Sequence, residues 1–218
     1  MATEPWWHDP IPAPDEAARA AAQRRQAELT KPPGSLGRLE AVAVQLAALQ
    51  ATSVPRVDPL HVTVFAADHG VAVEGVSAFP QAVTLEMVRN FARGGAAISV
   101  LARELGATLE VVDVGTAHPA AGLAGVIAAR AGAGTANLCD GPAMTTAQRD
   151  AALDAGRAAA GRAAAAGAHV FIGGDMGIGN TPPADRRCRL RPPARAPAGP
   201  GGPGTGLDAA GARRTRPR

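Results

Sequence analysis

Short runs of β-branched residues alternate with longer segments of helical composition along most of this chain. The runs that predict strands are residues 61–67, 108–115 and 168–172, with a further short candidate at residues 124–130. The segments between them have the apolar spacing and alanine content typical of helices. Because strands that alternate with helices favour a parallel sheet with helical crossovers, we predict an α/β fold with a mostly parallel sheet flanked by helices.

A helical segment without strands precedes this alternation. Residues 15–29 predict one helix, and Pro32-Pro33-Gly34 predicts its end. Ser35 is the expected cap of a second helix that runs to about Gln50. We therefore expect three parts: a small N-terminal helical part at residues 1–55, an α/β nucleotide-binding domain at residues 56–181, and a tail at residues 182–218.

The positive charge of the chain is concentrated in that tail. From residue 184 onward the chain has nine arginines and two acidic residues, whereas the part before it has 13 basic and 17 acidic residues. The tail is also rich in proline and has no apolar period, so we expect it to be irregular. The positive charge of the tail therefore does not indicate which molecules the folded part binds.

Composition excludes several classes of protein. Aromatic residues make up 3% with no tyrosine, which argues against a protein that stacks single-stranded nucleic acid. No run approaches the roughly 18 apolar residues of a membrane span, and no secretory signal is visible, so we expect a cytoplasmic protein without a membrane partner. Cys139 and Cys188 have neither the spacing of a metal site nor a disulfide framework.

A glycine-rich stretch follows the strand predicted at residues 168–172. Its glycines would let backbone N–H groups approach a ligand closely, and Asn180 and Thr181 add donors where a helix begins. Such a helix start favours an anion such as phosphate, and Asp175 supplies one carboxylate beside it. The alternative is an ordinary turn, because the stretch matches neither GxGxxG nor GxxxxGK[ST].

Other side chains stand where a site would form in such a fold. Asp68 and His69 follow the strand at residues 61–67, and ligands of parallel α/β sheets bind at the carboxyl ends of strands. The alternative is structural, with Asp68 capping a turn and His69 packed in the core. Phe79 is a candidate apolar wall, whereas the face of the next helix that carries Met87 is more typical of core.

The motifs of this chain, taken in order, resemble those of nicotinate-nucleotide–dimethylbenzimidazole phosphoribosyltransferases. The resemblance covers residues 11–181 and rests on seven stretches: residues 31–40 (KPPGSLGRLE), 67–71 (ADHGV), 94–97 (GGAA), 112–115 (VDVG), 134–137 (GTAN), 142–144 (PAM) and 174–181 (GDMGIGNT). It implies a Rossmann-like parallel sheet, a small helical domain, a homodimer, and no metal or other cofactor. The implied reaction attaches the azole to C1′ of nicotinate mononucleotide and releases nicotinate.

The resemblance also implies roles for single residues. Asp175, where many members have glutamate, would be an auxiliary acid or base in the transfer. The benzimidazole pocket would be formed by Phe79, Met87, Met176 and Ile178. The phosphate and ribose would be bound by Gly177, Gly179, Asn180 and Thr181, and by the second glycine loop that contains Gly202, Gly204 and Thr205.

Members of that family continue far beyond the last residue of this chain. We therefore expect a C-terminally truncated chain that lacks the glutamate usually assigned as the general base. Two compensating shifts of reading frame around residues 182–200, followed by early termination, are our hypothesis for the tail. The alternatives are, in order, a non-catalytic nucleotide-binding fragment, a nicotinamide-dependent oxidoreductase, and a nucleic-acid binder that uses the arginine-rich tail.

Overall fold

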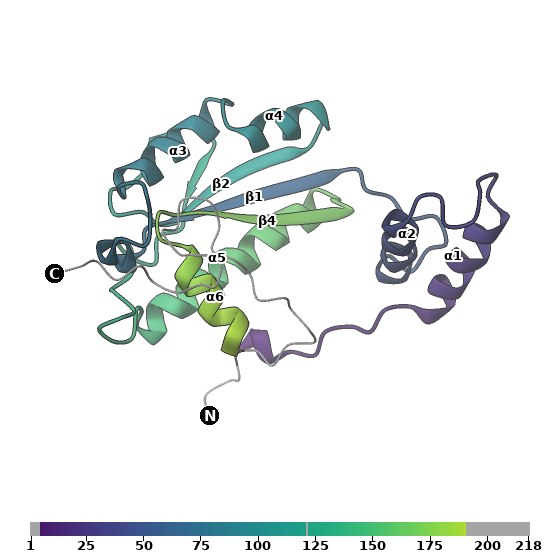
Figure 1. The fold of residues 1–218 in the computed structure, drawn as a ribbon, viewed down its shortest axis with the longest axis horizontal. Helices are drawn as coiled ribbons and strands as arrows, with labels where there is room; N and C mark the ends of the chain where they lie inside the picture. Colours follow the sequence, from purple (N-terminus) through teal and green to yellow (C-terminus); the bar gives the residue numbers. More distant parts are fainter. Residues whose placement is uncertain (1–4, 121, 191–218) are drawn as a thin grey trace. The chain divides into compact units, whose positions relative to one another are not determined.

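The computed structural model describes residues 5–120 and 122–190 (Figure 1). The chain divides into two compact units, Met1–Asp58 and Pro59–Arg218, and each is described by itself. Residues Gly202, Gly204 and Thr205, which the sequence assigns to a second phosphate loop, lie outside the described residues.

The first unit contains two packed helices. A 3-10 turn, η1 (Trp6–His8), precedes α1 (Glu16–Glu28) and α2 (Arg38–Leu49). Asp15 caps α1 by accepting the N–H of Ala18 at 2.8 Å, and the predicted first helix is confirmed. Alanines make the close contact between the helices, since the buried residues of α1 and α2 are Ala18, Ala22, Ala47 and Ala48.

The start of α2 differs from the prediction, because Ser35 is not its cap. The N-cap is Gly37, whose φ of 56° suits a residue without a side chain. The carboxylate of Glu40 accepts the hydrogen bonds of the preceding turn instead, from the Leu36 N–H at 3.2 Å and from the Lys31 ammonium at 2.8 Å. These contacts hold the pKa of Glu40 below its ordinary value, with the hydrogen bond from Lys31 as the largest cause.

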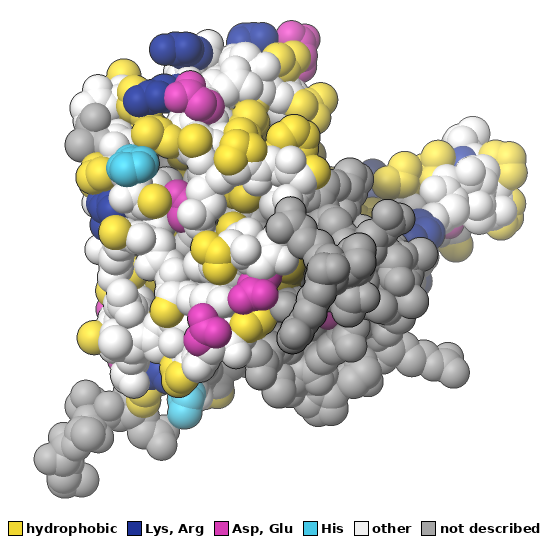
Figure 2. Space-filling model, turned by 60° about the vertical axis from the view of Figure 1, so that its left-hand side comes forward, with side chains coloured by type: hydrophobic (Ala, Val, Ile, Leu, Met, Phe, Trp, Pro, Cys, Tyr) yellow, Lys and Arg dark blue, Asp and Glu magenta, His cyan; other side chains and the backbone are white. Residues whose placement is uncertain are grey.

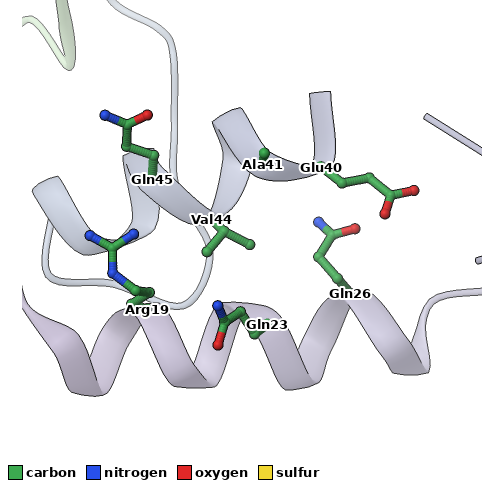
Figure 3. Close-up of a pocket in the computed structure, with 7 residues that line it drawn as sticks. All are labelled: Arg19, Gln23, Gln26, Glu40, Ala41, Val44 and Gln45. Carbon is green, nitrogen blue, oxygen red and sulfur yellow. The ribbon is translucent and has the colours of Figure 1, made fainter. Parts of the chain in front are cut away.

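A groove of about 500 Å³ lies between α1 and α2 (Figure 3). Amide and charged side chains line most of it, and the carboxylate among them, Glu40, is already paired with Lys31. The lining residues are Arg19, Gln23, Gln26, Glu40, Ala41, Val44 and Gln45. No motif of the sequence predicts a ligand at this groove.

The second unit is built on a four-stranded parallel sheet with the order β3-β2-β1-β4. Its strands are β1 (Leu60–Ala67), β2 (Thr108–Gly115), β3 (Val126–Ala128) and β4 (Val170–Met176). Strand β1 lies inside the sheet, between β2 and β4, and its residues 62–64 are buried, as its β-branched sequence favours. The predicted α/β fold is confirmed.

Helices cover both faces of this sheet (Figure 1). Helices α3 (Ala82–Ala92) and α4 (Ala97–Glu104) lie on one face, and α5 (Thr146–Ala165) lies on the other. The core under α3 consists of Ala66, Val88, Val111 and Ala120, against which Leu85 and Phe91 pack. Thr145 caps α5 in a capping box with Gln148.

Two predicted boundaries on the C-terminal side are wrong. Strand β4 does not end at the first glycines, because Gly173 and Gly174 pair with Thr63 and Val64 of β1. The irregular tail also does not begin at residue 182, because α6 (Thr181–Leu190) occupies this segment. Prolines are tolerated in the first turn of a helix, where their missing N–H groups have no intrahelical acceptor.

A glycine in the C-terminal half of α5 gives a first stability prediction. A Cβ added at Gly161 would have no atom within 4 Å, so we expect Gly161→Ala to raise the free energy of unfolding by about 0.5–1 kcal/mol. The matched change Gly134→Ala is expected to be destabilising, because Gly134 has a φ of 85° and its Cβ would lie 3.2 Å from the carbonyl oxygen of Asp68. Urea unfolding measures both, and an equal shift of the two midpoints would contradict these expectations.

Candidate functional site

The carboxyl ends of β1 and β2 are tied together by the loops that carry the sequence motifs. The N–H of Asp68 donates to Gly115 at 3.0 Å, and the N–H of Thr135 donates to Asp68 at 3.1 Å. Gly70 packs so closely on the second loop that an added Cβ would lie 2.5 Å from Ala136. Motifs far apart in the sequence therefore meet at this edge, where parallel α/β sheets bind ligands.

Asp113 organises the loop that follows β2. Its side chain is buried and accepts hydrogen bonds from the N–H groups of Thr116 and Ala120 and from the guanidinium of Arg130, at 2.9, 3.1 and 2.9 Å. Burial opposes its ionisation most strongly, but these bonds together keep the pKa of Asp113 below its ordinary value. Apart from its place in the VDVG motif, nothing in the sequence indicates this role.

The loop after β4 is a tight turn that is held in part by a residue of helix α3. Ile178 donates its N–H to the hydroxyl of Thr84 on α3 at 3.1 Å, a buried bond that sequence reasoning missed because the two residues are far apart in the chain. Asn180 donates its N–H to Gly177 at 3.0 Å, and Gly179 has the φ of 85° that such a turn requires. These bonds hold the loop in one conformation.

Several hydrogen-bond donors of this loop have no acceptor in the described part of the chain. Among the residues that the structure describes, no acceptor is found for the N–H groups of Gly179 and Thr181 or for the Thr181 hydroxyl. Thr181 begins α6, so these donors lie at the positive end of a helix, where anions are stabilised. The side chain of Asn180 is engaged, donating to the Asp175 carboxylate at 2.5 Å.

A cavity of about 150 Å³ brings most of the sequence-predicted residues together. Met176, Ile178 and Phe79 line it beside the loop donors, and Phe79 is 59% exposed. Its full lining is Val76, Ser77, Phe79, Met176, Gly177, Ile178, Gly179, Asn180, Thr181 and Pro182. Met87 is not among these residues and lies half-buried on α3, near Asn90.

Asp175 and His69 face a second, more apolar cavity of about 270 Å³. Apolar atoms of β1, β2, β4 and α5 form most of its wall, through Phe65, Ala67, Val114, Ala152, Gly156 and Met176. A neighbouring cavity of about 150 Å³ continues past His69 to the loop that carries Thr135. The carboxylate of Asp68 accepts the N–H of Ala117, in the loop that follows β2, at 2.7 Å, so it joins two loops and does not cap its own turn.

Three further observations concern charged side chains, metal ligands and membrane-spanning helices. On the face shown in Figure 2, basic and acidic side chains of the described residues stand close to one another near the top of the view. Within residues 5–120 and 122–190, no three His, Cys, Asp or Glu side chains gather as a metal ion would require. No helix in this described part is long and apolar enough to cross a membrane.

The fold is that of a Rossmann-like α/β protein with its candidate site at the carboxyl edge of the sheet. A family model described as phosphoribosyltransferase matches residues 11–216. The chain belongs to this phosphoribosyltransferase family.

Similar proteins carry a more specific name. The chain is 57% identical over 210 residues to a nicotinate-nucleotide–dimethylbenzimidazole phosphoribosyltransferase of Pseudomonas fluorescens, covering 96% of this chain and 59% of that one. It is 58% identical to the same enzyme of Pseudomonas aeruginosa, covering 94% and 58%. A crystal structure from Thermus thermophilus under this name superposes with a TM-score of 0.74 at 50% identity, covering 78% of this chain and 52% of that one. The chain thus spans less than two thirds of the length of these relatives.

Proposed function

We propose that this chain transfers phosphoribosyl from nicotinate mononucleotide to 5,6-dimethylbenzimidazole, giving α-ribazole phosphate and nicotinate. This reaction is the one for which its relatives are named, and it belongs to assembly of the cobalamin nucleotide loop. One observation carries the proposal: the open donors of Gly179 and Thr181 and the apolar side chains of Phe79 and Met176 line the same cavity. A phosphate and an aromatic ring can therefore be held side by side.

The loop would act mainly by positioning. Phosphate bound at the Gly179 and Thr181 donors would fix the ribose, so that an azole nitrogen attacks C1′ while the pyridine nitrogen of nicotinate leaves with its bonding electrons. The fixed turn means that these donors need no rearrangement when the ligand binds, because Thr84 and Gly177 already hold it.

Asp175 is proposed as an auxiliary acid or base beside this loop. Its carboxylate is exposed, lines the cavity of about 270 Å³ and is hydrogen-bonded by Asn180, so it can share the proton that the azole loses. Met176 lines both cavities and connects the two regions. Met87 as a wall of the azole pocket, the homodimer and the cytoplasmic location stay predictions.

Replacement of the carboxylate gives a test of this role. We expect Asp175→Asn to lower kcat for transfer by about 100-fold or more while leaving the KM for nicotinate mononucleotide nearly unchanged, because the group acts on the proton and not on the phosphate. Glu86→Gln, an exposed change on α3, is the matched control. Equal losses of binding and turnover in Asp175→Asn would instead make the acid a structural residue.

The proposed reaction itself is tested with purified protein, nicotinate mononucleotide and dimethylbenzimidazole. Chromatography with mass detection should show α-ribazole phosphate and nicotinate in equal amounts. Calorimetry with nicotinate mononucleotide in parallel separates binding from reaction. Binding without product would favour the non-catalytic nucleotide-binding protein, and neither binding nor product would contradict both functions.

A further inference from the structure

His69 occupies a position to which the reaction described above assigns no role. It follows β1 directly and forms part of the wall of both apolar cavities, of about 270 and 150 Å³. Its imidazole also packs against the loop after β4, because a Cβ added at Gly177 would lie 3.0 Å from its Nε2 and Cδ2 atoms. One ring therefore touches the proposed phosphate loop and faces both cavities.

The ring nitrogens of His69 are available to a ligand. Within residues 5–120 and 122–190, the hydrogen bonds of this residue go to its backbone carbonyl, which accepts the Gln81 side chain at 2.9 Å and the Ala72 N–H at 3.0 Å. No partner of the imidazole is found among the described residues, and the lining of the cavity of about 270 Å³ is otherwise apolar except for Asp175. A flat heterocycle with one N–H group matches this combination of an apolar wall with acceptors at His69 and Asp175.

Two carboxylates lie close enough to the imidazole to act on its charge. Burial lowers the pKa of His69, while the charges of Asp175 and, more weakly, Asp68 oppose that shift. The remaining residues that line the two cavities carry no charge. A neutral imidazole accepts a proton, and the carboxylates then stabilise the imidazolium.

We propose that the azole reaches past Met176 into the cavity of about 270 Å³, that His69 there accepts the azole proton during the transfer and that Asp175 stabilises the imidazolium, an inference that rests on the proposed function. In this step a C1′–N bond forms to the azole, and the bond from C1′ to the pyridine nitrogen breaks with its electron pair on nicotinate. The azole N–H proton passes to a ring nitrogen of His69 and later to solvent. The nicotinate ring is positively charged in the substrate and neutral in the product, and the released proton carries that charge away.

Nitrogen NMR of the wild-type protein tests the contact without turnover. With dimethylbenzimidazole as the only ligand, the imidazole nitrogen resonances of His69 should shift, whereas those of the exposed His118 should not. Unmoved His69 resonances at saturating azole would overturn the proposal, whatever the activity of the protein.

Kinetics of variants test the proton transfer itself. We expect His69→Gln to lower kcat by about 100-fold or more, with the KM for nicotinate mononucleotide nearly unchanged, and His118→Gln to have no effect. The wild-type transfer rate should fall on acidification as His69 is protonated. The pH–rate profile of His69→Gln should lack this acidic limb. Asp175→Asn should move the limb to lower pH, because removal of the carboxylate lowers the pKa of His69.

The outcomes separate this proposal from the proposed function. A wild-type protein that makes no α-ribazole phosphate contradicts the function. A wild-type protein that makes it, together with a His69→Gln variant of equal rate and pH profile, contradicts the role of His69 alone.

Discussion

The variant Asp113→Asn is expected to lose about 3–5 kcal/mol of unfolding free energy, a large effect for a single substitution. The carboxylate is 1% exposed and receives hydrogen bonds from Thr116, Ala120 and Arg130. An amide at this position turns one acceptor into a donor that faces other donors, and it leaves the Arg130 guanidinium without its counter-charge. Urea unfolding followed by circular dichroism measures the loss.

The matched control is Glu104→Gln, an exposed carboxylate at the end of α4, which should change stability by no more than about 0.5 kcal/mol. A loss below about 1 kcal/mol in Asp113→Asn would contradict the role assigned to these hydrogen bonds.

The dependence of stability on pH gives an independent test of the role of Asp113. Because the folded-state pKa of Asp113 is depressed, its ionisation stabilises the fold above the unfolded value of about 3.9, and this contribution is lost as pH falls through the folded pKa. Wild type should therefore lose more stability than Asp113→Asn between about pH 5 and pH 2. Equal losses would contradict the depressed pKa.

The variant Gly177→Val is expected to weaken binding of nicotinate mononucleotide by about 100-fold or more. The side chain would collide with the carbonyl oxygen of Ala67 and with the His69 ring, so the loop that carries Gly179 and Thr181 must move. The sequence attributes this glycine to close approach of a phosphate, whereas the structure shows that packing against β1 already requires it.

Gly141→Val is the matched control for this change. Gly141 lies in a loop with no atom within 4 Å of an added Cβ, so the variant should bind as wild type does. Calorimetry measures both, and circular dichroism verifies that the fold is retained. Unchanged affinity in Gly177→Val would show that the loop does not determine binding.

Elements with a local signal could be predicted from the sequence. The β-branched residues of β1 and β2 predict buried strands, and Asp15 and Thr145 mark the starts of α1 and α5. The grouping of Phe79, Met176 and Ile178 with the glycine loop is implied by family resemblance, and all of them line one cavity.

Features that depend on contacts distant in sequence could not be predicted. Gly173 and Gly174 have the composition of a turn, and only pairing with β1 makes them strand. The bond from Ile178 to Thr84 spans 94 residues, and the hydrogen bonds of Asp113 come from a loop without periodicity. The prolines at the start of α6 suggest irregular chain because composition does not reveal a position within the first turn.

The proposed function depends on one contact, in which the main-chain and hydroxyl donors of Gly179 and Thr181 bind the phosphate of a ribonucleotide. Amide NMR spectra of the ¹⁵N-labelled chain test this contact most directly, recorded with nicotinate mononucleotide and with its phosphate-free riboside. We predict large shifts of the Gly179 and Thr181 amide resonances with the mononucleotide and small ones with the riboside. Unmoved resonances at saturating mononucleotide, or equal shifts with both ligands, would contradict it.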